Sequence, residues 1–184
     1  NNVIRDMHPE RKLTVSQVIQ KSSNVGVAKM AMQLPPERLW NILSASGFGK
    51  PTQVGFPGEA GGNLRPFQSW KPIEQATMSY GHGISVSLLQ LVRAYSVFAT
   101  DGELISLTLL RRQAPVAGRR VIAVRSAQEV RKMLESVTQA EGTAPLAKVA
   151  GYRIAGKTGT AHKLVSGAYA PDRYVSSFVG FAPT

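Results

Sequence analysis

Apolar residues recur at helical spacing between Thr14 and Gly47. The first such stretch predicts a short helix from about Thr14 to Lys21, and either Thr14 or Ser16 is suited to cap its amino end. The same spacing predicts helices over 25–33 and 36–43, with Gly47 as the stop signal of the last one. We therefore expect three short helices, with Ser22-Ser23-Asn24 between the first two.

The longest helical pattern lies over 85–100, between Gly81-His82-Gly83 and Asp101-Gly102. The apolar face expected to be buried consists of Leu88, Leu91, Val92, Tyr95 and Phe98. Another helix is expected from a cap at Ser126 to about Ala140. Between these helices and the earlier ones, the segment 47–72 is rich in glycine, proline and aromatic residues, which predicts irregular structure folded over a surface.

Strand-forming residues are concentrated near the carboxyl end of the chain. The segments 152–163 and 174–182 predict two strands of a hairpin, with a turn around 167–173. Shorter strands are expected over 104–110 and 121–124. Helices mixed with antiparallel strands, in a chain of 184 residues, indicate a single domain of the α/β or α+β class.

The charge of the chain is strongly positive, with 22 Lys and Arg against 11 Asp and Glu. Seven of the basic residues and one acidic residue fall within 111–132, mostly in the turn expected between the two shorter strands. Such a cluster raises a nucleic-acid-binding module as one alternative function. Aromatic residues do not interleave with it as a base-stacking surface requires, so a solvated hairpin surface is the simpler interpretation.

The composition excludes several other kinds of site. The chain has no cysteine, which rules out disulfides, thiolate catalysis and sulfur-ligated zinc. Its histidines, His8, His82 and His162, are scattered singly, so we expect neither a metal site nor a cofactor. No apolar run approaches the roughly 18 residues of a membrane span.

One lysine belongs to two competing motifs. The run from Gly151 through Gly156-Lys157-Thr158 fits the phosphate-loop pattern, and a nucleotide-binding protein is therefore a second alternative. That mechanism needs a helix that begins at the lysine, and its spacer residues are normally small. Here the spacer is bulky and typical of a strand. On a strand, Lys157 and the hydroxyls of Thr158 and Thr160 would instead grip a carboxylate, and Gly159 would let a substrate backbone approach.

Ser22-x-Asn24 and Lys157-Thr158-Gly159 resemble two of the three signatures of the serine penicillin-binding and β-lactamase superfamily. The segments 55–59, 74–83 and 87–91 lie between them in the expected order. Together these residues resemble class B penicillin-binding proteins of the cell-division type, and the resemblance extends from Thr14 to Pro183. It implies a transpeptidase fold with helices around an antiparallel sheet, incomplete in this chain.

The resemblance also implies roles for individual residues. Ser22 would relay protons to the leaving or entering amine, and Asn24 would bind the substrate amide and help to position the first-motif lysine. Lys157 would supply the electrostatic field, while Thr158 and Thr160, on either side of Gly159, would bind the substrate carboxylate. Tyr80, Gly81 and His82 would lie near the rim of the cleft. His162 departs from the family, where division-type relatives often carry Arg.

The first signature, Ser-x-x-Lys, holds the nucleophile of this superfamily. No lysine of the chain has a serine three residues before it. We therefore expect 1–184 to be a partial transpeptidase domain without the Ser-x-x-Lys segment and without the last strand and helix, inactive by itself. For the parent protein, the resemblance implies peptidoglycan stem peptides ending in D-Ala-D-Ala, β-lactams and other division proteins as partners, and no nucleic acid. It also implies a periplasmic location, with an anchor in the inner membrane outside this chain.

Overall fold

The computed structural model describes residues 3–114, 117–165 and 168–184, with side chains at 164–169 and 171 left aside. The helices and 3-10 turns of these residues are α1 (Val15–Gln20), α2 (Asn24–Ala31), α3 (Pro36–Ala45), η1 (Phe67–Ser69), α4 (Pro72–Met78), α5 (Leu88–Ala99), α6 (Val124–Val137) and η2 (Pro145–Ala147). The strands are β1 (Asn63–Leu64), β2 (Ile84–Ser85), β3 (Glu103–Leu104), β4 (Arg119–Arg120), β5 (Ala155–Val165) and β6 (Ala168–Phe181).

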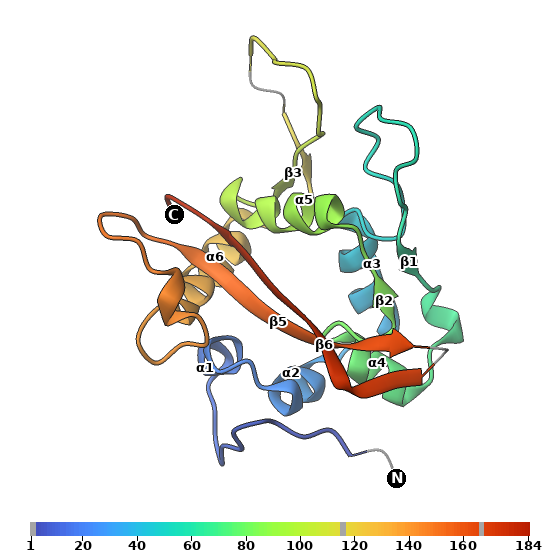
Figure 1. The fold of residues 1–184 in the computed structure, drawn as a ribbon, viewed down its shortest axis with the longest axis vertical. Coiled ribbons are helices and arrows are strands. Elements are labelled where there is room, and N and C mark those ends of the chain that lie inside the picture. Colours follow the sequence, from blue (N-terminus) through green and yellow to red (C-terminus); the bar gives the residue numbers. More distant parts are fainter. Residues whose placement is uncertain (1–2, 115–116, 166–167) are drawn as a thin grey trace.

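The long antiparallel hairpin of β5 and β6 crosses the middle of the molecule (Figure 1). Helix α6 packs against β5, and α5 contacts both α6 and β6. Helix α1 packs on α6, which brings the amino-terminal helices beside the hairpin. The pairs β1–β2 and β3–β4 are short antiparallel sheets of their own. Helices around antiparallel strands confirm the predicted fold class.

The hairpin expected over 152–163 and 174–182 is confirmed as an antiparallel pair, in which Ala155 faces Phe181 and Thr160 faces Ser176. The predicted turn is only partly right, because β6 already begins at Ala168 and so includes Asp172 and Arg173. Gly167, the other end of the predicted turn, lies outside the described residues. The strand β5 starts three residues later than expected, because the chain still turns at Gly151 with φ 82°.

The three amino-terminal helices are confirmed. Thr14 caps α1 through its hydroxyl, which accepts from the Gln17 amide, and the Gln17 side chain accepts in return from the Thr14 amide. Ser16 therefore lies inside the helix. At Gly26, an added Cβ would lie 2.6 Å from Cγ2 of Val18, so the glycine lets α2 pack closely on α1.

Helix α4 carries part of the 74–83 segment but was not expected as a helix. Its start has a recognisable signal: Pro72 occupies the first turn, and the Glu74 carboxylate accepts from the Lys71 amide at 2.7 Å. Buried Gln75 ties α4 to the end of α2, because its amide nitrogen donates to the carbonyls of Ala31 and Leu34 at 3.0 and 2.8 Å. The rest of 47–72 is irregular as predicted, apart from β1 and η1.

Helix α5 is confirmed, with Ser87 as its cap, but its expected buried face is wrong at two positions. Leu88 is 81% exposed and Val92 is 58% exposed, whereas Gln90, Ala94 and Val97 are buried. Gln90 is buried because its amide nitrogen donates to the carbonyls of Lys50 and Gly61, at 2.8 and 2.9 Å. These two bonds hold the glycine-rich loop against the helix. The buried face of α5 therefore includes a polar residue, Gln90, whereas the apolar pattern predicted Leu88 and Val92 there.

The strands predicted over 104–110 and 121–124 are wrong. The pairing is limited to β3 and β4, where Glu103 faces Arg120 and Leu104 faces Arg119. The Arg120 guanidinium forms an ion pair with Glu103 at 2.8 Å. A charged pair across the two strands therefore stabilises this short sheet, whereas apolar strand residues were expected there. Helix α6 is confirmed, but Ala123 precedes it as N-cap and Ser126 lies in its first turn, so the predicted cap is also wrong.

The described residues have two further general properties. Buried apolar side chains come from α1, α4, α5, α6 and β5, with Val18, Met78, Val97, Val137 and Ala155 among them. No helix in the described part of the chain has the length and apolar character needed to cross a membrane.

Candidate active site

Ser22 lies in the tight connection between α1 and α2. Its backbone has φ 58°, in the left-handed region that a serine rarely adopts. Ser23, the next residue, caps α2 by accepting from the Gly26 amide at 2.9 Å. The left-handed backbone of Ser22 makes the sharp turn between α1 and α2. The Ser22 side chain is exposed.

Lys157 meets Ser22 from the other end of the sequence. It is the third residue of β5, and its Nζ lies 2.7 Å from Oγ of Ser22, although 135 residues separate the two. Nζ also contacts the carbonyl oxygen of Thr158 at 3.2 Å. Burial lowers the pKa of Lys157 below its ordinary value of 10.5. The structure therefore brings together the serine and the lysine that the sequence singled out in separate motifs.

Asn24 is the first residue of α2 and is half-buried. Among the described residues, its side-chain amide makes no hydrogen bond to Ser22 or to Lys157. The arrangement thus leaves an amide with donor and acceptor capacity two residues from Ser22.

Thr158 and Thr160 follow Lys157 on β5. Oγ1 of Thr158 lies 2.8 Å from Oγ1 of Thr143, a residue of the loop after α6 that sequence analysis did not identify. Thr160 is exposed and faces Ser176 of β6. Between them, Gly159 has a structural reason to be glycine, because an added Cβ would lie 2.7 Å from Oγ of Ser177 on the partner strand. This reason is separate from the substrate approach that was expected of Gly159.

The turn that contains Tyr80, Gly81 and His82 follows α4. The rings of Tyr80 and His82 form an edge-to-face pair with centroids 5.2 Å apart. Burial raises the pKa of Tyr80. Burial, and then the charge of His162, lower the pKa of His82. The turn is therefore within electrostatic reach of β5, where His162 follows Thr160 by two residues and contacts the carbonyl of Ala170 at 2.9 Å.

The phosphate-loop alternative is wrong. Gly156 and Lys157 lie inside β5, and the strand continues to Val165. No helix begins at the lysine, so no helix amino end faces a phosphate there.

Much of the basic segment 111–132 serves the fold itself. The Arg119 guanidinium donates to the carbonyl of Ala45 at 2.6 Å, and Arg120 pairs with Glu103. Arg131 donates to the carbonyl of Phe98 at 2.9 Å and pairs with Asp101. These contacts give the arginines structural roles, and nothing in them supports a nucleic-acid interface.

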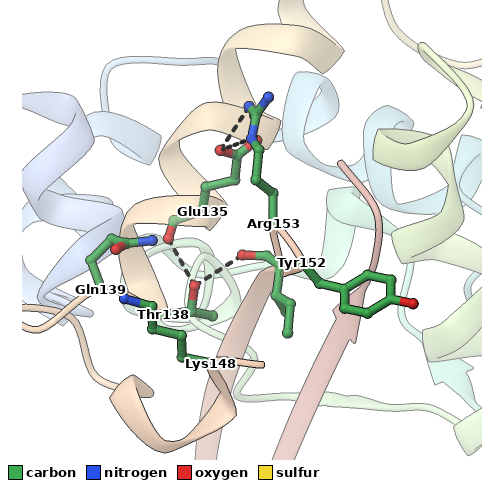
Figure 2. A pocket seen from close by; sticks show the side chains of 7 residues that line it. Glu135, Thr138, Gln139, Lys148, Tyr152 and Arg153 are labelled. Atoms are coloured by element: carbon green, nitrogen blue, oxygen red, sulfur yellow. Dashed lines mark hydrogen bonds and ion pairs between the residues drawn. The ribbon is translucent and has the colours of Figure 1, made fainter. Parts of the chain in front are cut away.

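A small cavity lies at the end of α6, and its lining does not include Ser22 or Lys157 (Figure 2). Its lining includes the bidentate pair of Arg153 and Glu135, with a shortest contact of 2.8 Å, and Thr138, whose hydroxyl donates to the Ile154 carbonyl at 2.9 Å. The Tyr152 ring points away from this pair in Figure 2. These bonds join α6 to the residues that lead into β5. Within the described ranges, no group of His, Asp or Glu is arranged to hold a metal ion.

Comparisons with known proteins find relatives that match over almost the whole chain. A probable peptidoglycan D,D-transpeptidase, PenA, of Neisseria flavescens is 43% identical over 98% of the chain, which covers 45% of that protein. The apo transpeptidase domain of penicillin-binding protein 3 from Burkholderia pseudomallei is 53% identical, with a TM-score of 0.89, over 93% of this chain and 52% of that one. Penicillin-binding protein 3 of Mycobacterium tuberculosis, complexed with aztreonam, is 34% identical, with a TM-score of 0.87, over 96% and 44% of the two chains.

The chain thus spans about half or less of the length of these relatives. The family model of the penicillin binding protein transpeptidase domain matches residues 1–184. The fold, the order of the motifs and this match agree, and the chain belongs to the family of penicillin-binding protein transpeptidase domains.

Proposed function

We propose that this chain is part of a peptidoglycan D,D-transpeptidase, which cross-links stem peptides through a serine acyl-enzyme and is acylated by β-lactams. The observation that carries the proposal is the 2.7 Å contact between Nζ of Lys157 and Oγ of Ser22. A lysine with a lowered pKa, in contact with an exposed hydroxyl, is a suitable pair for proton transfer. The names of the relatives, which are D,D-transpeptidases and penicillin-binding proteins, support the same chemistry.

In the first half-reaction, a serine outside these 184 residues attacks the carbonyl of the penultimate D-alanine. The bond from this carbonyl carbon to the nitrogen of the terminal D-alanine breaks, and an ester to the serine remains. The proton that the attacking serine gives up passes through the Ser22 hydroxyl, which the Lys157 ammonium polarises, to the nitrogen of the leaving amine. Free D-alanine is released.

In the second half-reaction, the amine of a neighbouring stem peptide attacks the ester carbonyl. The new amide bond forms, the ester bond breaks, and the nucleophilic serine regains its proton. Ser22 and Lys157 remove the proton from the entering amine along the path used before, in reverse. A β-lactam undergoes the first step, but its ring opens without losing a fragment that could diffuse away.

Binding would depend on the residues next to the pair. The hydroxyls of Thr158 and Thr160 bind the terminal carboxylate, and Lys157, which precedes Thr158 on β5, supplies positive charge. The backbone amide of Thr160 supplies one donor of the oxyanion hole. Asn24, whose amide is available two residues from Ser22, binds the substrate backbone and helps to position the first-motif lysine. Tyr80, Gly81 and His82 form part of the rim.

The parent protein would work in septal wall synthesis, at the periplasmic face of the inner membrane, with other division proteins as partners. Its Ser-x-x-Lys segment, its last strand and helix, and its membrane anchor would lie outside these 184 residues. Two observations support an incomplete domain: no Ser-x-x-Lys occurs in the chain, and Leu88 and Val92 leave an apolar stripe of α5 exposed. The absence of the first motif is also why we propose that the chain alone is inactive.

The test is to expose both the 184-residue chain and its full-length parent to labelled penicillin and, separately, to ATP. We expect a covalent adduct, measured by intact mass, on the parent alone. An adduct on the isolated chain would contradict the assignment of the nucleophile. A parent that folds but forms no adduct would contradict the proposed function, and ATP binding by the chain would contradict the role proposed for Lys157.

A further inference from the structure

We infer that Asp6 is a positioning residue for the proton-relay pair of Ser22 and Lys157, an inference that rests on the function proposed above. Asp6 lies in the segment before α1, outside every motif considered so far. Figure 1 shows this segment running alongside α2 before the chain turns into α1. This segment forms no helix or strand, so it is held against α2 by side-chain contacts.

The Asp6 carboxylate binds the start of α2 with both oxygens. Oδ2 accepts from the hydroxyl of Ser23 at 2.6 Å, and Oδ1 accepts from the backbone amide of Val25 at 3.0 Å. The Ser23 oxygen accepts in turn from the Gly26 amide at 2.9 Å. Two backbone amides in the first turn of α2 are thus satisfied: that of Val25 by Asp6 directly, and that of Gly26 by Ser23, whose hydroxyl donates to Asp6.

This arrangement is well suited to fix Ser23. Ser23 is only 6% exposed, so its hydroxyl needs an acceptor within the protein. A carboxylate is a stronger acceptor than a neutral oxygen, and its negative charge is favoured at the amino end of a helix. Removal of the Asp6 carboxylate would leave a buried donor and a helix-terminal amide without these partners.

The consequence for the site follows from the neighbouring residue. Ser22 has φ 58°, a conformation that costs free energy for a non-glycine residue and persists only when its surroundings hold it. On its carboxyl side, the next residue is Ser23, whose side chain Asp6 fixes. On its amino side, the Ser22 amide donates to the Ile19 carbonyl at 3.2 Å. Asp6 therefore holds the backbone that directs Oγ of Ser22 toward Nζ of Lys157.

The experiment uses the full-length parent with Asp6→Ala and Asp6→Asn, and with Glu10→Gln as a charge-matched control in the same exposed segment. The acylation rate constant and the dissociation constant of the pre-acylation complex are measured separately with labelled penicillin. Loss of a charge-assisted hydrogen bond predicts a fall of about 10-fold in the rate constant for Asp6→Ala, with a change under about 2-fold in the dissociation constant. Asp6→Asn keeps the shape and one acceptor, and we expect about 3-fold from it.

The decisive comparison repeats Asp6→Ala in a Ser22→Ala background. If Asp6 acts through Ser22, the second substitution lowers the rate constant no further. The same fall in both backgrounds, or a wild-type rate in Asp6→Ala, overturns the inference while the proposed function stands. A wild-type parent that forms no adduct overturns the proposed function, and the inference fails with it. Should Asp6→Ala not fold, the Asp6→Asn series in both backgrounds decides in the same way.

Discussion

The side-chain hydroxyls of Thr143 and Thr158 lie 2.8 Å apart and tie the loop after α6 to strand β5. Either hydroxyl can be the donor, and when Thr143 donates, the hydroxyl hydrogen of Thr158 remains available for another acceptor. The Thr158 hydroxyl must donate its hydrogen to the substrate carboxylate. It is better prepared to do so when the Thr143 hydroxyl donates to it than when it donates to Thr143.

Replacing Thr143 with Val keeps the shape of the side chain but removes its hydroxyl. We expect the parent protein to bind labelled penicillin about 3- to 10-fold more weakly before acylation, which corresponds to the loss of one hydrogen bond. The acylation rate constant should change less. Thr108→Val, in the exposed 108–114 segment, is the matched control. Equal binding by Thr143→Val and wild type would show that Thr158 needs no such partner.

Arg131 and Lys132 are adjacent basic residues on α6 with different environments. The Arg131 side chain is 20% exposed, donates to the Phe98 carbonyl and pairs with Asp101, whereas Lys132 is 69% exposed beside Glu129. Arg131→Met should lower the free energy of unfolding of the parent by about 1.5–3 kcal/mol, because the Phe98 carbonyl and the Asp101 carboxylate lose their shared donor.

The control is Lys132→Met, which should change the free energy of unfolding by less than about 0.5 kcal/mol because exposed ion pairs contribute little. Urea unfolding of the two variants measures both values. A similar loss for each would mean that the positive charge of the segment, rather than the contacts of Arg131, is what the fold requires.

The pKa of His82 is lowered from its ordinary value of 6.5, chiefly by burial and further by the charge of His162. Below pH 6.5, the unfolded chain therefore binds a proton that the folded chain resists. The contribution of His82 to stability is present above pH 6.5 and is lost as the pH falls toward the lowered pKa.

In thermal melts of the parent, the fall in melting temperature between about pH 8 and pH 5.5 should be smaller in His82→Gln than in wild type. His8→Gln, at an exposed position of the amino-terminal segment, serves as the control and should retain the wild-type dependence. If His82→Gln retained it as well, the proton uptake that destabilises the fold would belong to other groups.

The sequence predicted the elements whose signal is local. The capping residue Thr14, Pro36 at the start of α3 and the strand-forming residues over 152–163 each indicate their element without help from distant parts of the chain. The buried face of α5 was not predictable in this way, because Gln90 is buried by hydrogen bonds to a loop 29 and 40 residues away. The ladder at Arg119–Arg120 likewise depends on a charge pair rather than on apolar periodicity.

The residues of the candidate site likewise fall into those that the sequence reveals and those that only the fold reveals. Ser22, Asn24 and Lys157 stand in short motifs that can be read directly, whereas Asp6 and Thr143 are ordinary residues until folding places them beside Ser23 and Thr158. Contacts of this kind depend on the packing of segments distant in sequence, so no spacing rule reveals them. Gly159 is an intermediate case, since its motif is visible but its close approach to Ser177 is not.

The central claim is that Ser22 and Lys157 act as one unit in acyl transfer. It is tested most directly by a double-mutant cycle in the full-length parent, with Ser22→Ala, Lys157→Ala and the double variant, and with the rate constant of acylation by labelled penicillin as the measured quantity. We predict that each single substitution lowers the rate at least about 100-fold and that the double variant is scarcely slower than the worse single variant, as for residues that function together. Independent effects that multiply in the double variant would contradict the claim.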